Sequence, residues 1–543
     1  MHRAIWLIVC WLLVACQLPS QFQEIVDQGP TVPRGGRVEL LVDDSLAVMQ
    51  PWQVDSRASE ALISLTLSGL MRHDTAGIPQ PELLDTWQVD VTGTVLTATL
   101  KSDLRWSDGQ PLTSADVVYT YELLKSLPIT SPLLDQAQLI TAVIPVSAQG
   151  VRFELARPYA PLLTLWSLPI LPGHVLANQA VASLNLRTLT VGSGPFVLKQ
   201  IDANGRFLLD ANPNYVGGVP LLDGVVLTPQ AGADASLERS DYTLIDTATP
   251  LLTTTSVYSA ALSVTNEFTA VVMNMRSSSP LAEIGVRRAL VAATDAEAAL
   301  EMASLRDWRP MTSVVLPSGW LNSTYVVSDT SDIQPLLYAA GWRWDDAQQQ
   351  YVREGEVVTM RMLVNADAQD QVAMANILRQ QWQQQGIAVE LDAQPRAAYL
   401  AALAPPYAYE LAIVTLANGR SSSTYADTLL YDPDTSSLFA SEALNAGPPD
   451  ARGSLNVTGM SDVQFDQASR SAQRAYASAD RQALQPTMHD RVNLLHPMVL
   501  VGRPYRSVYW LPRLQVWQGQ LRLDSPWYLS DAYRWYLEPE AQP

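Results

Sequence analysis

The chain has 543 residues and a formal net charge of −19 at pH 7. This length is more than one compact core usually holds, so we expect two or three lobes. The acidic balance argues against nucleic-acid binding and against broad adsorption to anionic membranes. With 48% hydrophobic and 16% charged residues, the chain is expected to be globular, neither disordered nor embedded in a membrane.

Sulfur and imidazole ligands for a metal are scarce in this sequence. The only two cysteines, Cys10 and Cys16, lie near the N-terminus, so no disulfide or thiolate metal site is expected downstream. The five histidines are too few and too scattered to predict a multi-histidine centre. We therefore predict no metal site and no cofactor.

The N-terminus has the pattern of a secretory leader. Arg3 precedes an apolar run from Ala4 to Ala15, which is too short to span a membrane and is typical of a signal peptide. Residues 17–36 are polar, with prolines and a Gly-Gly pair, and predict a flexible tether. Residues 13–16 resemble a bacterial lipobox, which implies a lipoprotein signal peptide over residues 1–16 and lipidation of Cys16. An ordinary secretory leader with a chance cysteine is the alternative.

Apolar spacing in the rest of the chain predicts a mixed α/β protein. A helix between two alternating strands over residues 358–391 favours parallel pairing with a right-handed crossover. The predicted strands are 37–42, 87–91, 95–100, 151–155, 196–199, 269–275, 358–364, 387–391 and 411–416. The predicted helices are 59–70, one that begins after Thr113, 284–295, one that ends at Gly341, and 370–385.

The stretch 96–125 carries the clearest local signals. Residues 96–100 alternate between apolar and polar, which is the period of a half-buried strand. The Asp-Gly pair at 108–109 predicts a turn, because glycine accepts a positive φ at no steric cost. Thr113 can cap a helix, with Asp116 in its first turn. These residues therefore predict a strand, a turn and an amphipathic helix.

Several strings in the sequence resemble those of one protein family. Residues 106–118 (Trp-Ser-Asp-Gly-Gln-Pro-Leu-Thr-Ser-Ala-Asp-Val-Val) resemble the W-S-D-G-x-P-x-T-A-x-D-V motif of the family 5 extracellular solute-binding proteins, the peptide- and nickel-type receptors of ABC importers. In that family this motif marks the fold and is not the ligand site. Other matching strings follow in the family's order at 68–70, 79–87, 158–174, 192–196, 212–215, 222–226, 269–275, 284–295, 336–342, 463–480 and 493–500.

Three of these strings leave a question open. Ser68 stands where the family carries Glu, and one proline of the return strand at 493–500 is missing near His496. The string Gly192 to Phe196 is compatible with two interpretations. It could place backbone amides near a ligand, or it could form a tight turn into the next strand.

The resemblance implies an α/β, two-lobed periplasmic-binding-protein-like fold (type II, large peptide-binding class) with an extra subdomain in the first lobe. The first lobe would comprise residues 37–268, with the inserted subdomain at about 60–180. The second lobe would comprise residues 269–491, and residues 492–543 would return to the first lobe.

The resemblance also points to ligand-binding residues. Tyr425 to Asp427 resemble the family's W-x-A-D-Y-x-D-P string, which implies that Asp427 pairs with the α-ammonium of a peptide. Such a charge-assisted bond contributes roughly 1.5–3 kcal/mol. Tyr425, Arg420 and Asn274, the last expected in the hinge, are further candidates. The alternatives are a loop cap for Asp427, a structural hinge residue for Asn274 and a solvated surface charge for Arg420.

The resemblance to this family implies a receptor that closes on a peptide and delivers it to a membrane permease driven by a cytoplasmic ATPase. It would be a monomer, anchored by lipid to the outer face of the cytoplasmic membrane. The alternatives are the same fold binding a sugar, an opine or a metal chelate, or a sensor that signals to a membrane partner. An extracellular hydrolase comes third, and no catalytic residue is predicted, because the sequence lacks the nucleophile-elbow, zinc-protease, P-loop and dinucleotide-binding motifs.

Overall fold

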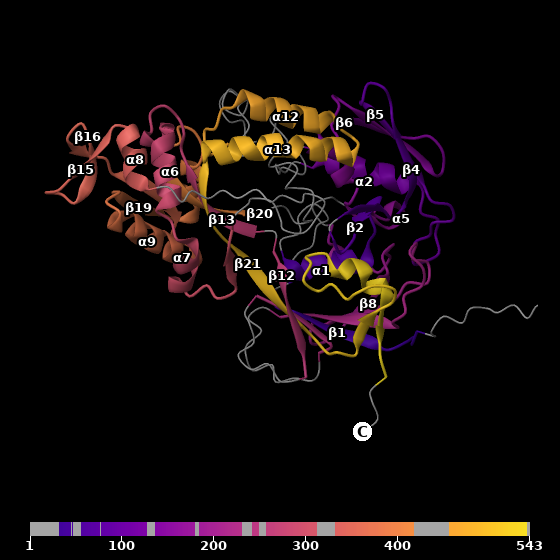
Figure 1. Ribbon diagram of the computed structural model, residues 1–543. Helices are drawn as coiled ribbons and strands as arrows, with labels where there is room; N and C mark the ends of the chain where they lie inside the picture. Colours follow the sequence, from indigo (N-terminus) through magenta and orange to yellow (C-terminus); the bar gives the residue numbers. More distant parts are fainter. Residues whose placement is uncertain are drawn as a thin grey trace, which may run out of the picture.

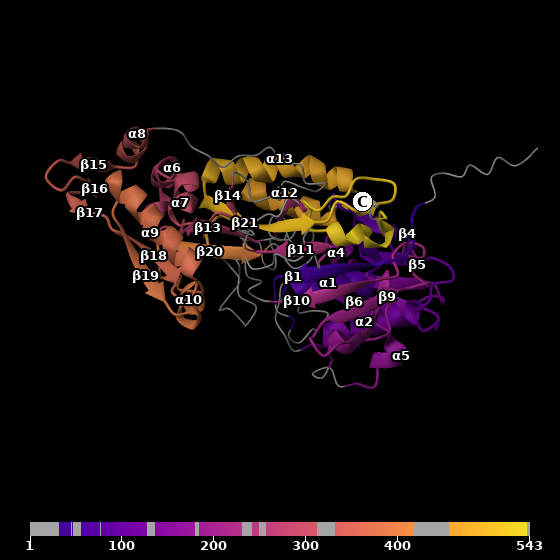
Figure 2. The same ribbon diagram turned by 90° about the horizontal axis from the view of Figure 1, so that it is seen from below.

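The computed structural model describes residues 32–44, 46, 56–76, 78–127, 136–179, 184–230, 242–248, 257–265, 267–311, 332–417 and 456–539. These residues form a mixed α/β molecule in which one large sheet joins two groups of helices and smaller sheets (Figure 1). Seen from below, the molecule is elongated, with β16 (Gln350–Arg353) at one end and α5 (Gly173–Leu176) toward the other (Figure 2).

Within the described residues, twelve strands form the large sheet in the order β19-β18-β20-β13-β21-β11-β1-β10-β9-β8, and β12 and β14 also pair with β21. β18 and β19 pair in parallel, as the strand-helix-strand pattern predicts. The strands are β1 (Arg37–Val42), β8 (Phe196–Ile201), β9 (Phe207–Ala211), β10 (Gly224–Pro229), β11 (Leu244–Thr247), β12 (Ser259–Val264), β13 (Glu267–Met273), β14 (Trp308–Pro310), β18 (Met360–Asn365), β19 (Val389–Gln394), β20 (Leu411–Ala417) and β21 (Met498–Trp510).

The long strand β21 divides this sheet into two halves, because it changes partners along its length. It pairs with β13 and β14 as far as Pro504, and with β12 and β11 from Tyr505 onward. We call β1 and β8 to β12 the β1 half, and β13, β14 and β18 to β20 the β13 half. The chain passes between the halves a second time between Val264 and Glu267, the adjoining ends of β12 and β13. We call these two places the crossings.

Smaller elements surround the large sheet. β4 (Leu84–Val89), β5 (Val95–Leu100), β7 (Gly150–Leu155) and β6 (Ile140–Pro145) form a four-stranded antiparallel sheet in that order, which we call the inserted sheet. The other strands are β2 (Met71–His73), β3 (Pro79–Pro81), β15 (Trp342–Asp345), β17 (Glu356–Val357), β22 (Leu514–Val516) and β23 (Trp535–Leu537). The remaining helices are α1 (Arg57–Thr66), α2 (Ser114–Ser126), α4 (Leu162–Leu165), η2 (Leu186–Thr188), η3 (Pro280–Ala282), α6 (Ile284–Ala292), α7 (Ala296–Met302), α8 (Ile333–Ala339), α9 (Gln369–Gln384), α10 (Arg396–Ala402), α12 (Val463–Arg474), α13 (Ser478–Leu495) and η5 (Tyr528–Arg534).

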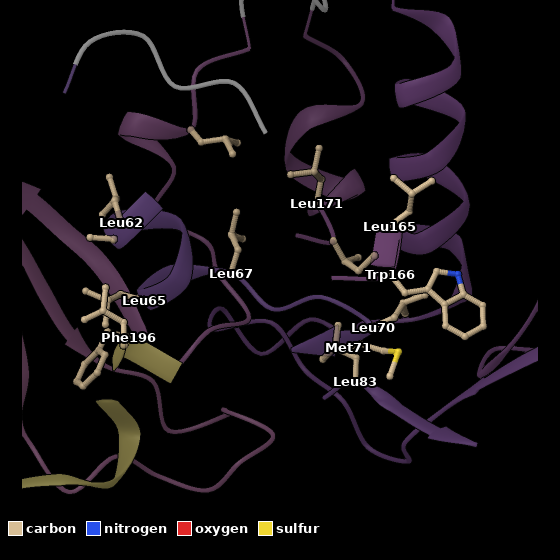
Figure 3. Close-up of a cluster of buried hydrophobic side chains, with 14 of the residues drawn as sticks. Leu62, Leu65, Leu67, Leu70, Met71, Leu83, Leu165, Trp166, Leu171 and Phe196 are labelled. Carbon is tan, nitrogen blue, oxygen red and sulfur yellow. The ribbon is translucent and has the colours of Figure 1, made fainter. Parts of the chain in front are cut away.

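Strand β13 separates two cores, because successive side chains of a strand point to opposite faces. Phe268 and Ala270 pack with α10, α12 and α13, whereas Val271 and Met273 pack with α6 to α9. A third, larger core joins the β1 half, the inserted sheet and the aromatic C-terminal tail. Figure 3 shows part of this core, where Leu65 of α1 lies beside Phe196 of β8.

The strand, turn and helix predicted for residues 96–125 are confirmed. β5 ends at Leu100, and Gly109 has a φ of +86° in the turn that follows. α2 begins after Thr113, whose backbone and side chain form a reciprocal capping box with Asp116. The apolar face of this helix is buried, including Val117.

Strings that lie far apart in the sequence meet around the indole of Trp106, which is fully buried. Asn214 donates its side-chain amide to the carbonyl of Trp106 at 2.9 Å. His174 lies with Nε2 2.9 Å from a carboxylate oxygen of Asp108. The motif that begins at Trp106 therefore holds the fold together, and its side chains are engaged in doing so.

The string 192–196 is a tight turn into β8, which confirms the second of the two interpretations. The amide of Gly194 donates to the carbonyl of Thr66 at 2.9 Å, and the amide of Gly192 donates to the hydroxyl of Ser107 at 3.1 Å. A Cβ on Gly194 would approach the carbonyl carbon of Thr66 within 2.6 Å. Glycine is needed here for close packing on the end of α1.

Ser68, which replaces the family's Glu, lies next to a carboxylate from elsewhere in the chain. Its hydroxyl donates to Oε1 of the buried Glu82 at 3.0 Å, and the hydroxyl of Tyr215 donates to the same oxygen at 3.0 Å. The backbone amide of Gly69 donates to the other oxygen at 3.3 Å. This position therefore keeps a buried carboxylate, and Glu82 supplies it.

Several predicted boundaries are wrong. α1 ends at Thr66, because Leu67 adopts an extended backbone. The string at 463–480 lies on two helices, α12 and α13, and the second continues to Leu495, so the return strand expected from residue 493 starts at Met498. By contrast, Gly341 ends α8 as predicted, because it follows the C-cap residue Ala340 with a φ of +84°.

Candidate ligand site

The carboxyl ends of the parallel strands in both halves lie at the crossings. β1 is parallel to β10 and β11, and the last residue of β11, Thr247, pairs with Ser507 of β21. β18 is parallel to β19 and β20, and the last residue of β20, Ala417, pairs with Glu267, where the chain enters the β13 half. Open α/β sheets bind ligands outside the carboxyl ends of their strands. The region of the crossings is therefore the candidate ligand site.

A saturated cluster of charges stands at this edge of the β1 half. Asp246 is fully buried and accepts hydrogen bonds from Nε of Arg57 at 3.0 Å, from the hydroxyl of Tyr528 at 2.9 Å and from Nε of Arg506. Arg57 also contacts Glu60 at 2.7 Å. Burial alone would raise the pKa of Asp246, but the two guanidinium groups outweigh it and hold this pKa at about 2. The carboxylate is charged at neutral pH, and its two cations fix α1 and β21 to the edge of the sheet.

Acidic groups gather where the two halves meet. Partial burial raises the pKa of Glu267, whose side chain keeps contact with solvent. The carboxylate of Asp370, in the first turn of α9, adds to this rise, Arg506 opposes it, and Asp44 adds a smaller repulsion. Three carboxylates close to one guanidinium create a negative local potential, which favours a cationic group of a ligand.

A polar row lies beside these charges inside the β13 half. The hydroxyls of Thr269 and Thr415 are 2.8 Å apart, and Gln371 donates its side-chain amide to Thr415 at 2.8 Å. The Oε1 atom of Gln371 is buried without a hydrogen-bond partner among the residues that the structure describes. This oxygen could accept a hydrogen bond from a ligand that enters between the halves.

Asn274 lies directly after β13, at the end remote from the crossing. Its Nδ2 donates to the carbonyls of Tyr409 at 2.9 Å and Tyr407 at 3.3 Å, and its Oδ1 accepts from Arg276 at 3.0 Å. The residue follows Glu267 by seven positions of extended chain, which is roughly 20 Å. The structure thus places Asn274 away from the crossings, and its location in a hinge stays a prediction. A ligand contact by Asn274 stays a prediction, and its saturated amide favours a structural role.

The inserted sheet contacts the corner between α12 and α13. The hydroxyl of Tyr476 donates to the carbonyl of Gly93 in the β4–β5 turn at 2.7 Å and accepts from the amide of Tyr159 at 3.1 Å. Arg157 donates to the side chain of Gln473 at 2.8 Å. The inserted sheet packs with the β1 half, and α12 and α13 pack with the β13 half, so these contacts join the two halves a third time, away from the crossings. α12 and α13 lie across the top of Figure 1.

The other predicted site residues, Asp427, Tyr425 and Arg420, lie outside the described residues, as does Cys16. The cluster around Asp246 was not predicted, and no local pattern could have revealed it. Across the described ranges, no group of three or more His, Cys, Asp or Glu side chains is arranged to hold a metal ion. No helix in those ranges is long and apolar enough to cross a membrane.

Comparison with known proteins identifies the class. The sequence model of the bacterial extracellular solute-binding proteins, family 5, matches residues 79–434, which is more than half of the chain. The chain therefore belongs to this family of binding proteins of ABC importers, a binding class rather than a class of enzymes. The family is extracytoplasmic, and its members serve permease and ATPase partners.

Individual relatives are more distant. The peptidoglycan-binding protein YepA of Agrobacterium fabrum is 27% identical over 213 residues, 37% of this chain and 34% of that protein, so the match spans about a third of its length. The oligopeptide-binding protein AppA of Bacillus subtilis, in complex with a nonapeptide, has a TM-score of 0.65 at 19% identity over 94% of this chain and 100% of that chain. NikZ of Campylobacter jejuni, in complex with Ni(L-His), has a TM-score of 0.67 at 18% identity over 92% and 99%. The two structures establish the two-lobed periplasmic-binding-protein fold.

Proposed function

We propose that this protein captures a peptide between two lobes, one built on each half of the large sheet, and delivers it to a membrane permease. The lobes would comprise residues 37–268 with 492–543, and residues 269–491, and would close by rotation about the crossings. The observation that carries the proposal is the meeting of both sets of carboxyl strand ends at those crossings. Lipidation at Cys16 would hold a monomeric receptor at the outer face of the cytoplasmic membrane.

In this proposal Asp427 pairs with the α-ammonium of the peptide, and Tyr425 and Arg420 lie close to the ligand. The acidic surroundings of Glu267 support the binding of a cationic ligand group near the crossings. Asp427→Asn is expected to weaken peptide binding about tenfold or more, because about 1.4 kcal/mol corresponds to a factor of ten. Isothermal calorimetry would measure the affinity, with Asp524→Asn, at an exposed ion pair, as the control. An unchanged affinity of Asp427→Asn would remove this anchor.

The strongest alternative is a non-peptide solute bound by the same fold, since the similar structure of NikZ holds a metal chelate. Native mass spectrometry of the protein purified without denaturation distinguishes the two. A ladder of peptide masses supports the peptide receptor, whereas one non-peptide mass keeps the fold and discards the ammonium anchor. A protein that binds no solute in a wide thermal-shift screen would favour a sensor that responds to another signal.

A further inference from the structure

Arg503 lies next to the point where β21 changes partners. It lies two residues before Tyr505, where the strand leaves β14 and starts to pair with β12. The preceding pairing of β21 with β13 is irregular near Thr269 and Ala270, so the strand is already bent when it reaches Arg503. The side chain therefore starts from the crossing itself, between the carboxyl strand ends of the two halves.

The guanidinium of Arg503 is buried and lacks a hydrogen-bond partner in the part of the chain that the structure describes. The residue is 3% exposed, and its Nε, Nη1 and Nη2 atoms are all inaccessible to solvent and have no hydrogen-bond partner among the described residues. Burial lowers the pKa of Arg503 to about 10, with Tyr505 opposing the change, so the side chain is still charged at neutral pH. Leaving such a group uncompensated is strongly unfavourable, and native proteins rarely do so without a functional reason.

Arg287 shows how the same chain buries an arginine for structural purposes. It is 2% exposed, but its Nε donates to the carbonyl of Leu495 at 2.7 Å, and its Nη1 donates to the carbonyls of Leu281 and Ala282 at 2.7 and 2.8 Å. Depth of burial is thus nearly equal at the two arginines, and only the supply of acceptors differs. The lack of acceptors for the N–H groups of Arg503 is therefore a property of its site and does not follow from burial alone.

A second cation stands directly opposite. Arg309 of β14 is the register partner of Arg503 in an antiparallel pair. Arg309 is exposed, and its Nη1 donates to the carbonyls of Arg306 at 2.9 Å and Trp308 at 2.7 Å, so this cation, unlike Arg503, is supplied with acceptors and with water. An anion beside Arg503 would supply the missing hydrogen bonds.

The chemistry of the guanidinium selects the anion. Its planar fork of N–H donors matches a carboxylate, which can accept two parallel hydrogen bonds. We propose that Arg503 binds a carboxylate of the ligand, and that in a peptide ligand this group is the C-terminal carboxylate. The ligand would enter when the lobes are apart and would be enclosed at Arg503 when they close. The identity of the carboxylate rests on the proposed function, whereas the anion site itself does not.

The binding test uses one set of short peptides in two forms, with free C-terminal carboxylates and with C-terminal amides. Calorimetry on ligand-stripped wild type is expected to give about tenfold or greater preference for the free acids. Arg503→Met is expected to lose this preference and to bind both forms weakly, and Arg503→Lys to restore part of it. Arg287→Met is the matched control, which is expected to keep the wild-type preference.

A stability measurement separates a ligand site from a structural arginine. Arg503→Met removes an uncompensated charge, so the ligand-free variant is expected to melt at or above the temperature of ligand-free wild type. Arg287→Met leaves three buried or partly buried carbonyls without this donor and is expected to melt lower. A melting temperature of Arg503→Met reduced as far as that of Arg287→Met would overturn the proposal.

The remaining outcomes are also decisive. Equal binding of free-acid peptides by wild type and Arg503→Met would overturn the inference while leaving the peptide receptor intact. If wild type binds neither peptide form, the proposed function fails, and the anion site is tested with small di- and tricarboxylates, an opine-like N-carboxyalkyl amino acid among them. A thermal shift in wild type that Arg503→Met abolishes would then support Arg503, and no shift with any carboxylate would refute it.

Discussion

Buried charges occur in two opposite settings in this molecule. Around Asp246, in the β1 half, the carboxylate is met by Arg57, Arg506 and the hydroxyl of Tyr528. At the crossing, Arg503 is equally enclosed but meets no acceptor among the described residues. Both settings withdraw an ion from water, which is costly unless the protein replaces the lost solvation. The first setting is complete within the described residues, whereas we propose that a ligand completes the second.

This difference teaches how to separate structural from functional charges by the sign of a stability change. Removing one member of a saturated cluster leaves its partners buried and unpaired, so the free energy of unfolding falls. Removing an unpaired charge relieves the folded state, so this free energy stays the same or rises. The comparison therefore depends on every charge of the Asp246 cluster having its partner. The substitution with the largest predicted effect, Asp246→Asn, tests this.

Asp246→Asn is expected to lower the free energy of unfolding by about 3–5 kcal/mol, because it leaves two buried guanidinium groups without their carboxylate. Urea unfolding at pH 7 would measure the change. Asp524→Asn is the control, because Asp524 pairs with Arg522 at 3.0 Å on the surface, where both side chains are about half exposed. That variant is expected to lose less than about 1 kcal/mol. A similar small loss for Asp246→Asn would end the contrast between the two settings.

Two buried histidines extend the comparison to charges that the fold excludes. Burial lowers the pKa of His73 and of His489 to about 4 each, so both are neutral in the folded protein at pH 7. The unfolded chain takes up these protons near pH 6.5, so stability is complete above that pH and is lost as the pH falls from about 6.5 to about 4. Each histidine is expected to contribute a loss of about 2 kcal/mol at pH 5.

Urea unfolding of wild type, His73→Gln and His489→Gln between pH 7 and pH 5 would test this expectation. The quantity to compare is the slope of stability with pH, because each substitution also changes packing and hence the absolute value. Raised pKa values at Glu60 and Glu82, both caused by burial, act in the opposite direction in all three proteins. A slope that neither substitution reduces would show that these imidazoles titrate normally in the fold.

Local patterns predicted the elements of this fold because strands and helices carry their period in a few residues. The alternation at 358–364 and 387–391 and the helix between them predicted β18, α9 and β19, and Trp382 of this helix is fully buried. The cap at Thr113 was predictable for the same reason, since both of its partners lie within three residues.

The candidate site was mostly beyond reach of such patterns. The partners of Asp246 come from positions 57, 506 and 528, and nothing in the run around Arg503 signals that strand pairing will bury it. For Asn274 the resemblance supplied the string of the crossover strand but not the point where the chain crosses, which lies seven residues earlier at Glu267. Charge compensation is a property of the tertiary structure, so a sequence can name the ions but not their partners.

The smallest predicted effect concerns a neutral contact, the hydroxyl of Tyr476 between the inserted sheet and the α12–α13 corner. If the lobes rotate apart about the crossings, this contact must break. Tyr476→Phe is therefore expected to favour the open form by about 1 kcal/mol, which raises the ratio of open to closed molecules by a factor of about five. Small-angle scattering without ligand would detect a larger radius of gyration. Tyr121→Phe is the matched control, because its hydroxyl also donates to a carbonyl, that of Leu165 at 2.9 Å, but within one core. Equal radii of gyration for the two variants would mean that the Tyr476 contact persists in the open form. The lobes would then move while still joined at the two crossings and at the Tyr476 contact.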